Sequence, residues 1–221
     1  MMPGVPSTLK DRRSAGSLLA DRLSDLGGER PIILALPRGG VPVALEIARK
    51  LRAPLDVMIV RKLGAPDNPE YGLGAMVEDG TYTFDEGRLR EAGYTRADFE
   101  GIVRRERAET ERRCAVYRAV CPRTDRKGRT VVLVDDGAAT GGTLFSAIGA
   151  ARADGARRVV AALGVAPPET CRELERRADR LAVLLQPEAF FAVGQFYERF
   201  DPVEDDEVLS LLRAASDIAR P

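Results

Sequence analysis

Two adjacent carboxylates, Asp135 and Asp136, stand between an apolar run, VVLV, and a loop of small residues at 137–142. A helix is predicted to begin directly after the loop. Backbone N–H groups in such a loop and the positive end of the helix dipole favour a phosphate, to which Thr140 and Thr143 can add hydroxyl donors. The carboxylates can accept hydrogen bonds from a diol and help to hold a divalent cation. The segment therefore fits a sugar phosphate better than a nucleoside triphosphate.

Two common phosphate motifs do not fit this segment. A P-loop started at Gly137 needs a lysine where the chain has Thr143. The Rossmann pattern GxGxxG does not occur here either. A strand, turn and helix without a ligand is the alternative, but two acids at the end of a buried strand need a physical reason.

Basic residues follow two other apolar runs. Arg38 stands beside Gly39 and Gly40, and a glycine pair lets the backbone direct its amides at an anion while the arginine offers a bidentate fork. Arginine beside glycine is also common in ordinary turns, so this segment alone leaves both interpretations open. Arg61 and Lys62 end the second apolar run, where the alternative is a pair of surface charges.

The composition excludes several kinds of chemistry. The chain of 221 residues has no histidine, which rules out histidine-based general bases, Ser-His-Asp triads and histidine-ligated metals. Its 34 basic and 34 acidic residues balance, so nothing in the charge calls for nucleic acid or a membrane surface. The sequence shows no signal peptide and no apolar stretch of about 20 residues, so we expect a cytoplasmic protein.

The elements that must position these residues alternate between strand and helix. Short apolar runs predict buried strands at residues 31–36, 55–60, 131–134, 158–165 and 181–185. Helical spacing is found near residues 9–26, 41–51, 143–153, 169–178 and 205–219. This order predicts an α/β, Rossmann-type fold, a parallel sheet flanked by helices, in a single domain over residues 1–221. A hairpin at 75–84 and a charged helical insertion at about 85–122 interrupt it.

The segment from 131 to 143 resembles the binding signature for phosphoribosyl pyrophosphate (PRPP) in type I phosphoribosyltransferases, and the resemblance continues along most of the chain. It implies that Asp135 and Asp136 hold the ribose hydroxyls and Mg²⁺, the latter directly or indirectly. The ending ATGGT is most similar to adenine phosphoribosyltransferases, whereas the hypoxanthine-guanine enzymes carry an aspartate where this chain has Ala139. The resemblance places the 5-phosphate on Gly137, Ala138, Ala139, Thr140, Gly141, Gly142 and Thr143.

The same resemblance assigns the remaining parts of the site. Arg38, Gly39 and Gly40 match the pyrophosphate loop, and the segment IVRKLGAP is similar to one in the adenine enzymes whose basic residues face pyrophosphate. The family's mobile catalytic loop corresponds to residues 63–73, which contain no lysine or arginine. Catalytic roles then fall to Arg38, Arg61 and Lys62.

An aromatic segment at 187–203 is the candidate for the hood, the small subdomain that covers the acceptor in this family. Its FAVG is similar to the FVVG of hypoxanthine-guanine enzymes, which would place Phe191, Val193 and Gln195 beside a planar base. Local core packing of these aromatic residues is the alternative.

The resemblance implies transfer of ribose 5-phosphate from PRPP to a nitrogenous base, with Mg²⁺ as cofactor and a homodimer as the assembly. The general base is open between Glu70 and Glu78. A PRPP-sensing regulator without turnover and a sugar-phosphate or nucleotide hydrolase are the alternative functions. Fold alone does not decide among them.

Overall fold

Five parallel strands form the central sheet, in the order β2-β1-β6-β7-β8. The structure, a computed structural model, describes residues 7–69, 71–216 and 218. The strands are β1 (Ile32–Ala35), β2 (Leu55–Val57), β6 (Thr130–Gly137), β7 (Arg158–Val165) and β8 (Arg180–Leu185). Their nearly continuous apolar sequences are typical of parallel strands that are covered on both faces.

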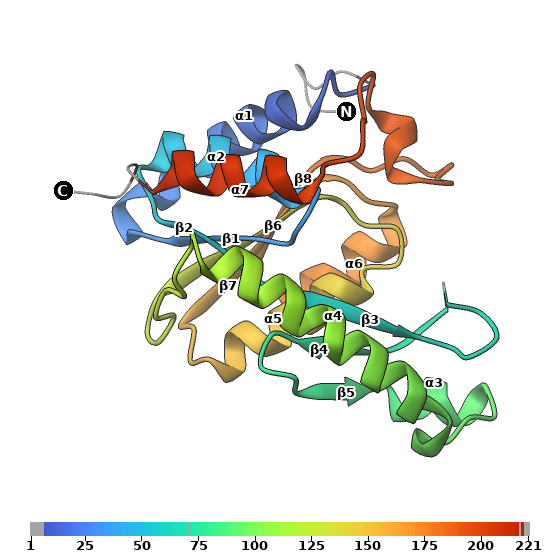
Figure 1. Ribbon diagram of the computed structural model, residues 1–221. Coiled ribbons are helices and arrows are strands. Elements are labelled where there is room, and N and C mark those ends of the chain that lie inside the picture. Colours follow the sequence, from blue (N-terminus) through green and yellow to red (C-terminus); the bar gives the residue numbers. More distant parts are fainter. Residues whose placement is uncertain (1–6, 70, 217, 219–221) are drawn as a thin grey trace.

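Helices cover both faces of this sheet (Figure 1). One layer contains α1 (Arg12–Arg22), α2 (Gly40–Leu51) and α7 (Asp205–Ala215), and the other contains α5 (Gly142–Ala153) and α6 (Pro168–Arg177). The predicted α/β fold with a flanked parallel sheet is confirmed. The predicted helix at 9–26 is shorter than expected, because a 3₁₀ helix, η1 (Ser24–Glu29), follows α1.

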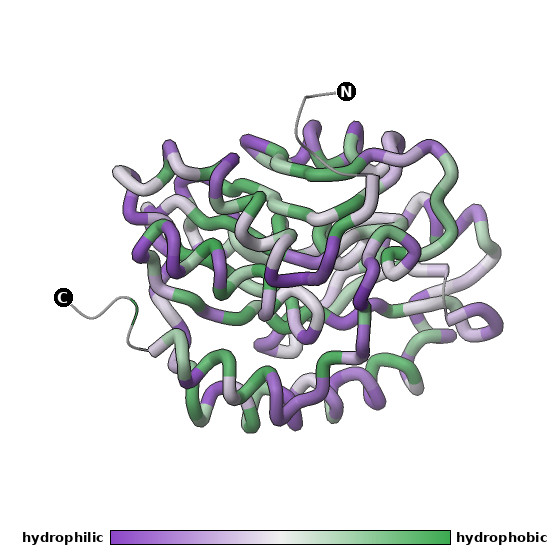
Figure 2. The backbone as a smooth tube through the Cα atoms, turned by 90° about the horizontal axis from the view of Figure 1, so that it is seen from above, coloured by the Kyte–Doolittle hydropathy of each residue, from purple (hydrophilic) through white to green (hydrophobic). Residues whose placement is uncertain are grey.

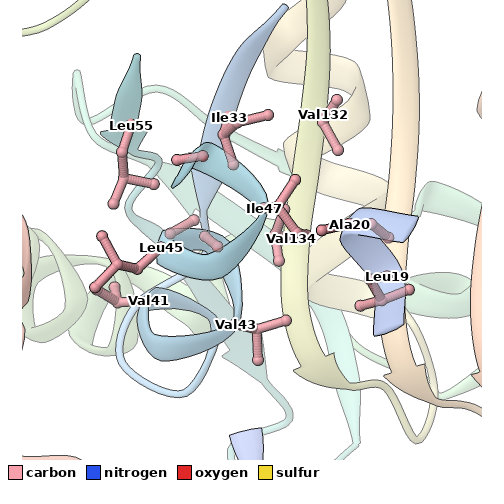
Figure 3. Close-up of a cluster of buried hydrophobic side chains, with 14 of the residues drawn as sticks. Leu19, Ala20, Ile33, Val41, Val43, Leu45, Ile47, Leu55, Val132 and Val134 are labelled. Atoms are coloured by element: carbon pink, nitrogen blue, oxygen red, sulfur yellow. The ribbon is translucent and has the colours of Figure 1, made fainter. Parts of the chain in front are cut away.

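The two faces of the sheet have separate hydrophobic cores because successive strand residues point to opposite sides. Ile33 and Val132 pack with Leu19 of α1 and Ile47 of α2, all fully buried (Figure 3). Leu133, between two residues of that core, belongs instead to the cluster beneath α5 and α6. The central strands are thereby fixed from both sides at the level where the acidic pair begins.

A second sheet leaves the central one where the sequence predicted a single strand at 55–60. The N–H of Met58 donates to the Ala35 carbonyl at 2.9 Å, after which the chain turns away. The second sheet is antiparallel and contains β3 (Val60–Gly64), β4 (Gly72–Val77) and β5 (Tyr82–Phe84). The predicted hairpin is confirmed as β4–β5, but Arg61 and Lys62 lie inside β3 rather than at the end of the second strand. The apolar run shows no break at this turn, so length and hydropathy could not reveal it.

The charged segment that follows is helical, as predicted. It contains α3 (Glu86–Glu91), the 3₁₀ helix η2 (Arg96–Phe99) and α4 (Glu100–Arg118), and it packs on the second sheet through a small core of its own. Hydrophilic and hydrophobic residues alternate along the outer helices (Figure 2). In the described part of the chain, no helix is both long and apolar enough to cross a membrane.

Buried charges join this insertion to the central sheet. Asp56 of β2 is fully buried, and Arg118 at the end of α4 donates to it at 2.5 Å. Arg118 also donates to Glu78 after β4 at 2.6 Å, and the buried Arg126 lies 3.5 Å from both carboxylates. A buried ion pair contributes little net stability, but removing one partner is costly because it leaves the other charge uncompensated.

We expect Asp56→Asn to lower the free energy of unfolding by about 3–5 kcal/mol, because Arg118 and Arg126 lose a buried counter-charge. The matched control is Asp21→Asn, which removes an exposed pair with Lys50 and should cost at most about 1 kcal/mol. Urea unfolding of the three proteins measures both values. Equal, small losses in the two variants would contradict a structural role for this charge cluster.

Candidate functional site

The acidic pair lies within the last residues of β6. The predicted strand ended at residue 134, but Asp135 pairs with Leu163 and Gly137 with Val165, so the strand continues through both acids. The side chain of Asp135 turns back and accepts the N–H of Asp136 at 2.9 Å. Both carboxylates therefore lie at the carboxyl edge of the central sheet, where ligands bind in folds of this type.

The two acids have different surroundings. Asp136 is 8% exposed, and its Oδ2 accepts a hydrogen bond from Nε of Arg12 at 2.7 Å. Asp135 is half-buried. Burial raises the pKa of Asp135 well above its ordinary value, and the neighbouring charge of Asp136 raises it further. Burial also raises the pKa of Asp136, while the guanidinium of Arg12 opposes this shift.

The small-residue loop offers its amides unevenly. The N–H of Ala138 donates to the Val165 carbonyl at 2.9 Å, so this amide continues the sheet and is not directed at a ligand. Ala139 and Thr140 are exposed, and Gly141 has a φ of 73°, which lets the chain turn into α5. The first N–H groups of any helix lack acceptors within it, so the start of α5 favours an anion.

Helix α6 holds this loop in place. Oγ1 of Thr170 donates to the Ala139 carbonyl at 2.6 Å, and Thr170 is itself buried. The sequence analysis assigned no role to this residue, because nothing in the helix spacing connects it to the loop. Its effect is to leave the Ala139 and Thr140 amides on the outer side of the turn.

The segment LPRGG packs directly against the acidic pair. A Cβ atom placed on Gly39 would lie 2.0 Å from Oδ2 of Asp136, and one on Gly40 would lie 2.4 Å from the Val134 carbonyl oxygen. The peptide bond between Pro37 and Arg38 is cis. Nη1 of Arg38 donates to Glu204 at 2.8 Å, so the structure brings the predicted pyrophosphate loop to the acids while an acidic partner holds its arginine.

The basic residues of β3 divide between two faces. Nε of Arg61 donates to Glu106 of α4 at 2.7 Å, which directs this side chain toward the insertion. Lys62, the next residue, lines a crevice of about 1100 Å³ together with Ala139, Thr140 and Gly142 of the small-residue loop. Because successive strand residues point to opposite sides, only Lys62 of this pair reaches the loop.

The hood segment lies over the end of β6. Val193, in the 3₁₀ helix η3 (Val193–Phe196), sits so close to Gly137 that a Cβ there would be 2.7 Å from its Cγ1. Phe191 is 87% exposed, and its N–H donates to the side chain of Gln195 at 3.3 Å. The alternative of local packing describes Phe190, which stacks on Phe196 with ring centres 5.3 Å apart. Phe191, Val193 and Gln195 thus lie together on the hood.

Tyr197 and Arg12 connect the hood to the acidic pair, and the sequence analysis gave neither a role. The hydroxyl of Tyr197 donates to the Asp136 carbonyl at 2.6 Å, and burial raises the pKa of this tyrosine. Arg12 stands in a run of charged residues that gives no local signal, since its partner Asp136 is 124 positions away.

The candidate general bases are not supported by the arrangement. Glu78 is surrounded by Arg118, Arg123 and Arg126 in the buried charge cluster, with Arg118 at 2.6 Å and Arg123 at 3.3 Å. Its negative charge therefore already serves three cations. Glu70 lies outside the described residues.

Comparison with known proteins gives consistent matches. The model of the family described as phosphoribosyl transferase domain matches residues 8–197. Proteins of Mycobacterium tuberculosis strains CDC 1551 and H37Rv, both provisionally named phosphoribosyl transferase, are 43% identical over 210 residues, or 95% of this chain and 47% of each relative. The chain thus spans about half the length of the curated relatives it matches. The crystal structure of the protein TT1426 from Thermus thermophilus is 45% identical with a TM-score of 0.82, covering 94% of this chain and 98% of that one.

We expect Gly39→Ala to destabilise the protein by about 1–3 kcal/mol, because the added methyl group overlaps the Asp136 carboxylate. The φ of −60° at Gly39 suits alanine, so the contact and not the backbone is the cause. Gly28→Ala is the control, since a Cβ there meets no atom within 4 Å. If urea unfolding gave the same midpoint for both variants, the close approach of this loop to Asp136 would be in error.

Proposed function

The chain belongs to the phosphoribosyl transferase domain family, and from this premise we propose that it transfers ribose 5-phosphate from PRPP to a nitrogenous base and releases pyrophosphate. One observation carries the proposal: the acidic pair, the start of α5 and the LPRGG turn meet at a single edge of the sheet. These parts complement the diol, the 5-phosphate and the pyrophosphate of one ligand.

In the proposed complex, the 5-phosphate lies at the start of α5, where Thr140 and Thr143 add hydroxyl donors to the free amides. The ribose diol donates hydrogen bonds to the acidic pair, with the half-buried Asp135 better placed for it than Asp136. The bond from the anomeric carbon to pyrophosphate breaks as the bond to the acceptor nitrogen forms. Positive charge develops on the sugar in an oxocarbenium-like transition state, as it does in glycoside cleavage.

Cations on two elements are proposed to stabilise the leaving pyrophosphate. Arg38 reaches from the LPRGG turn, and Lys62 shares the crevice that borders the small-residue loop. Arg38 must leave Glu204 to do so, and this ion pair is exposed enough for the exchange to cost little, with side chains 36% and 70% exposed. Arg61 is a weaker candidate, because Glu106 holds it toward α4.

Magnesium fits the donor chemistry of this edge. Among the described residues no group of three or more histidine, cysteine, aspartate or glutamate side chains could hold a metal by itself. Mg²⁺ is commonly bound by one or two carboxylates together with substrate phosphates, and Asp135 and Asp136 are hard oxygen donors of that kind. When bound with PRPP, the ion would neutralise charge on the pyrophosphate.

The hood offers the place for the acceptor. Phe191 presents a free aromatic face, while Val193 and Gln195 flank it with an apolar contact and an amide. An exposed ring on a segment packed over Gly137 is suited to stack on a planar nitrogenous base.

A PRPP sensor without turnover is the second candidate, and one observation favours it. The structure pairs Arg38 with Glu204 and Arg61 with Glu106, so two of the three proposed pyrophosphate cations already have acidic partners. A protein that only binds PRPP needs less leaving-group stabilisation than a transferase does.

Calorimetric titration of PRPP with Mg²⁺ tests the shared premise of both functions. We expect the wild-type protein to bind and Asp135→Asn to bind at least about tenfold more weakly, since hydrogen bonds to a charged group are worth about 1.5–3 kcal/mol. Asp206→Asn, which removes one exposed carboxylate on α7, should bind as the wild type does. Absence of wild-type binding would overturn the proposal. Pyrophosphate release with a panel of purine and pyrimidine bases then separates the transferase from the sensor, which would bind PRPP and release none.

The acceptor site is tested by Phe191→Ala. We expect the KM for the base to rise by about tenfold or more, because aromatic stacking on a base is worth about 1–3 kcal/mol, while stability stays unchanged for a ring this exposed. Phe190→Ala is the matched control: it removes the ring stacked on Phe196 and should lower the melting temperature instead. An unchanged KM in Phe191→Ala would remove this ring from the acceptor site.

A further inference from the structure

Arg12 makes three contacts that meet at the acidic pair. Nε donates to Oδ2 of Asp136 at 2.7 Å, and Nη1 donates to the carbonyl of Asp201 at 2.8 Å. The guanidinium carbon lies 3.8 Å from the centre of the Phe200 ring. One side chain of α1 thus touches a proposed ribose ligand and two residues of the hood segment 187–203.

This ion pair differs from the many exposed pairs of the molecule. The side chains of Arg12 and Asp136 are each 12% exposed, whereas Lys50 and Asp21 are 56% and 63% exposed. Solvent screening is weak for such a buried pair, and the planar guanidinium can bond to Asp136 and Asp201 while it stacks on Phe200. An ammonium group on the same helix could satisfy the charge but not all three contacts.

Asp136 is also bound to the hood through its backbone. Its carbonyl accepts the hydroxyl of Tyr197 at 2.6 Å. The hood is held in turn by the segment before α1, where the N–H of Leu9 donates to Phe196 and the Leu9 carbonyl accepts from Glu198, both at 2.8 Å. The hood, the start of α1 and Asp136 therefore form one connected unit.

We propose that Arg12 is a positioning residue that divides the work of the acidic pair. Asp135 faces the sugar, and Asp136, fixed by Arg12, transmits the state of the ribose site to the hood. This inference rests on the proposed function and goes beyond it, because the family resemblance treats both acids as ribose ligands. Binding of PRPP and docking of the hood are then coupled through a single side chain that does not touch the substrate.

Hydrogen exchange of the hood measures the first part of this inference without any ligand. We expect Arg12→Gln and Asp136→Asn to speed amide exchange in residues 193–203, and Asp135→Asn to leave it unchanged. Arg13→Gln is the matched control, since Arg13 is the exposed neighbour of Arg12 on α1. Arg12→Lys keeps the charge and should give intermediate exchange, which also covers the case that Arg12→Gln folds poorly. Unchanged exchange in both Arg12 variants would overturn the inference.

PRPP affinity supplies a measurement that a merely structural role would not move. With PRPP and Mg²⁺ as the probe, we expect Arg12→Gln to weaken binding about fivefold to tenfold, a typical loss for coupled residues in contact. The double variant Arg12→Gln/Asp136→Asn should bind within about twofold of Asp136→Asn, because both changes break the same link. Multiplying losses would overturn the inference and leave the proposed function intact. No PRPP binding by the wild type would overturn both.

Discussion

The burial of two adjacent carboxylates at the end of β6 is the constraint on which the rest of the site depends. Charged groups removed from water need compensating partners, and each acid obtains them differently. Asp135 accepts the neighbouring N–H, while Asp136 is paired with Arg12. The central position of β6, with β1 on one side and β7 on the other, prevents these acids from moving to a more solvated place. The surrounding segments are therefore selected by what they offer to the acids.

Charge in this protein is neutral in sum and organised in local clusters. The cluster of Asp56, Glu78, Arg118 and Arg126 fixes the second sheet and the insertion to the central sheet. A separate set of exposed pairs, including Arg38 with Glu204, lies around the site and is easier to exchange. The difference in burial separates charges that build the scaffold from charges that are free to meet an anion.

Local chemistry explains what could be predicted from the sequence. Buried parallel strands appear as apolar runs, and the small-residue loop after Asp136 marks a phosphate site because few other sequences place so many free amides together. The change of sheet near Met58 was not predictable, since the residues on both sides are equally apolar. The Ala138 amide could not be excluded without knowing its partner Val165. Arg12 and Tyr197 act across long sequence separations, for which spacing carries no information.

The pairing of the hood with the segment before α1 has a consequence for the order of assembly. Asp11 bonds to Arg199 and Arg12 to Asp201, contacts between residues 188 and 189 positions apart. During synthesis the phosphate loop emerges well before the hood, so a partly made chain carries the loop and both acids without their cover. Closing so long a separation costs chain entropy that local helices and hairpins do not require, which places this step late in folding. The nascent chain therefore cannot present a finished site until nearly all of the described residues have left the ribosome.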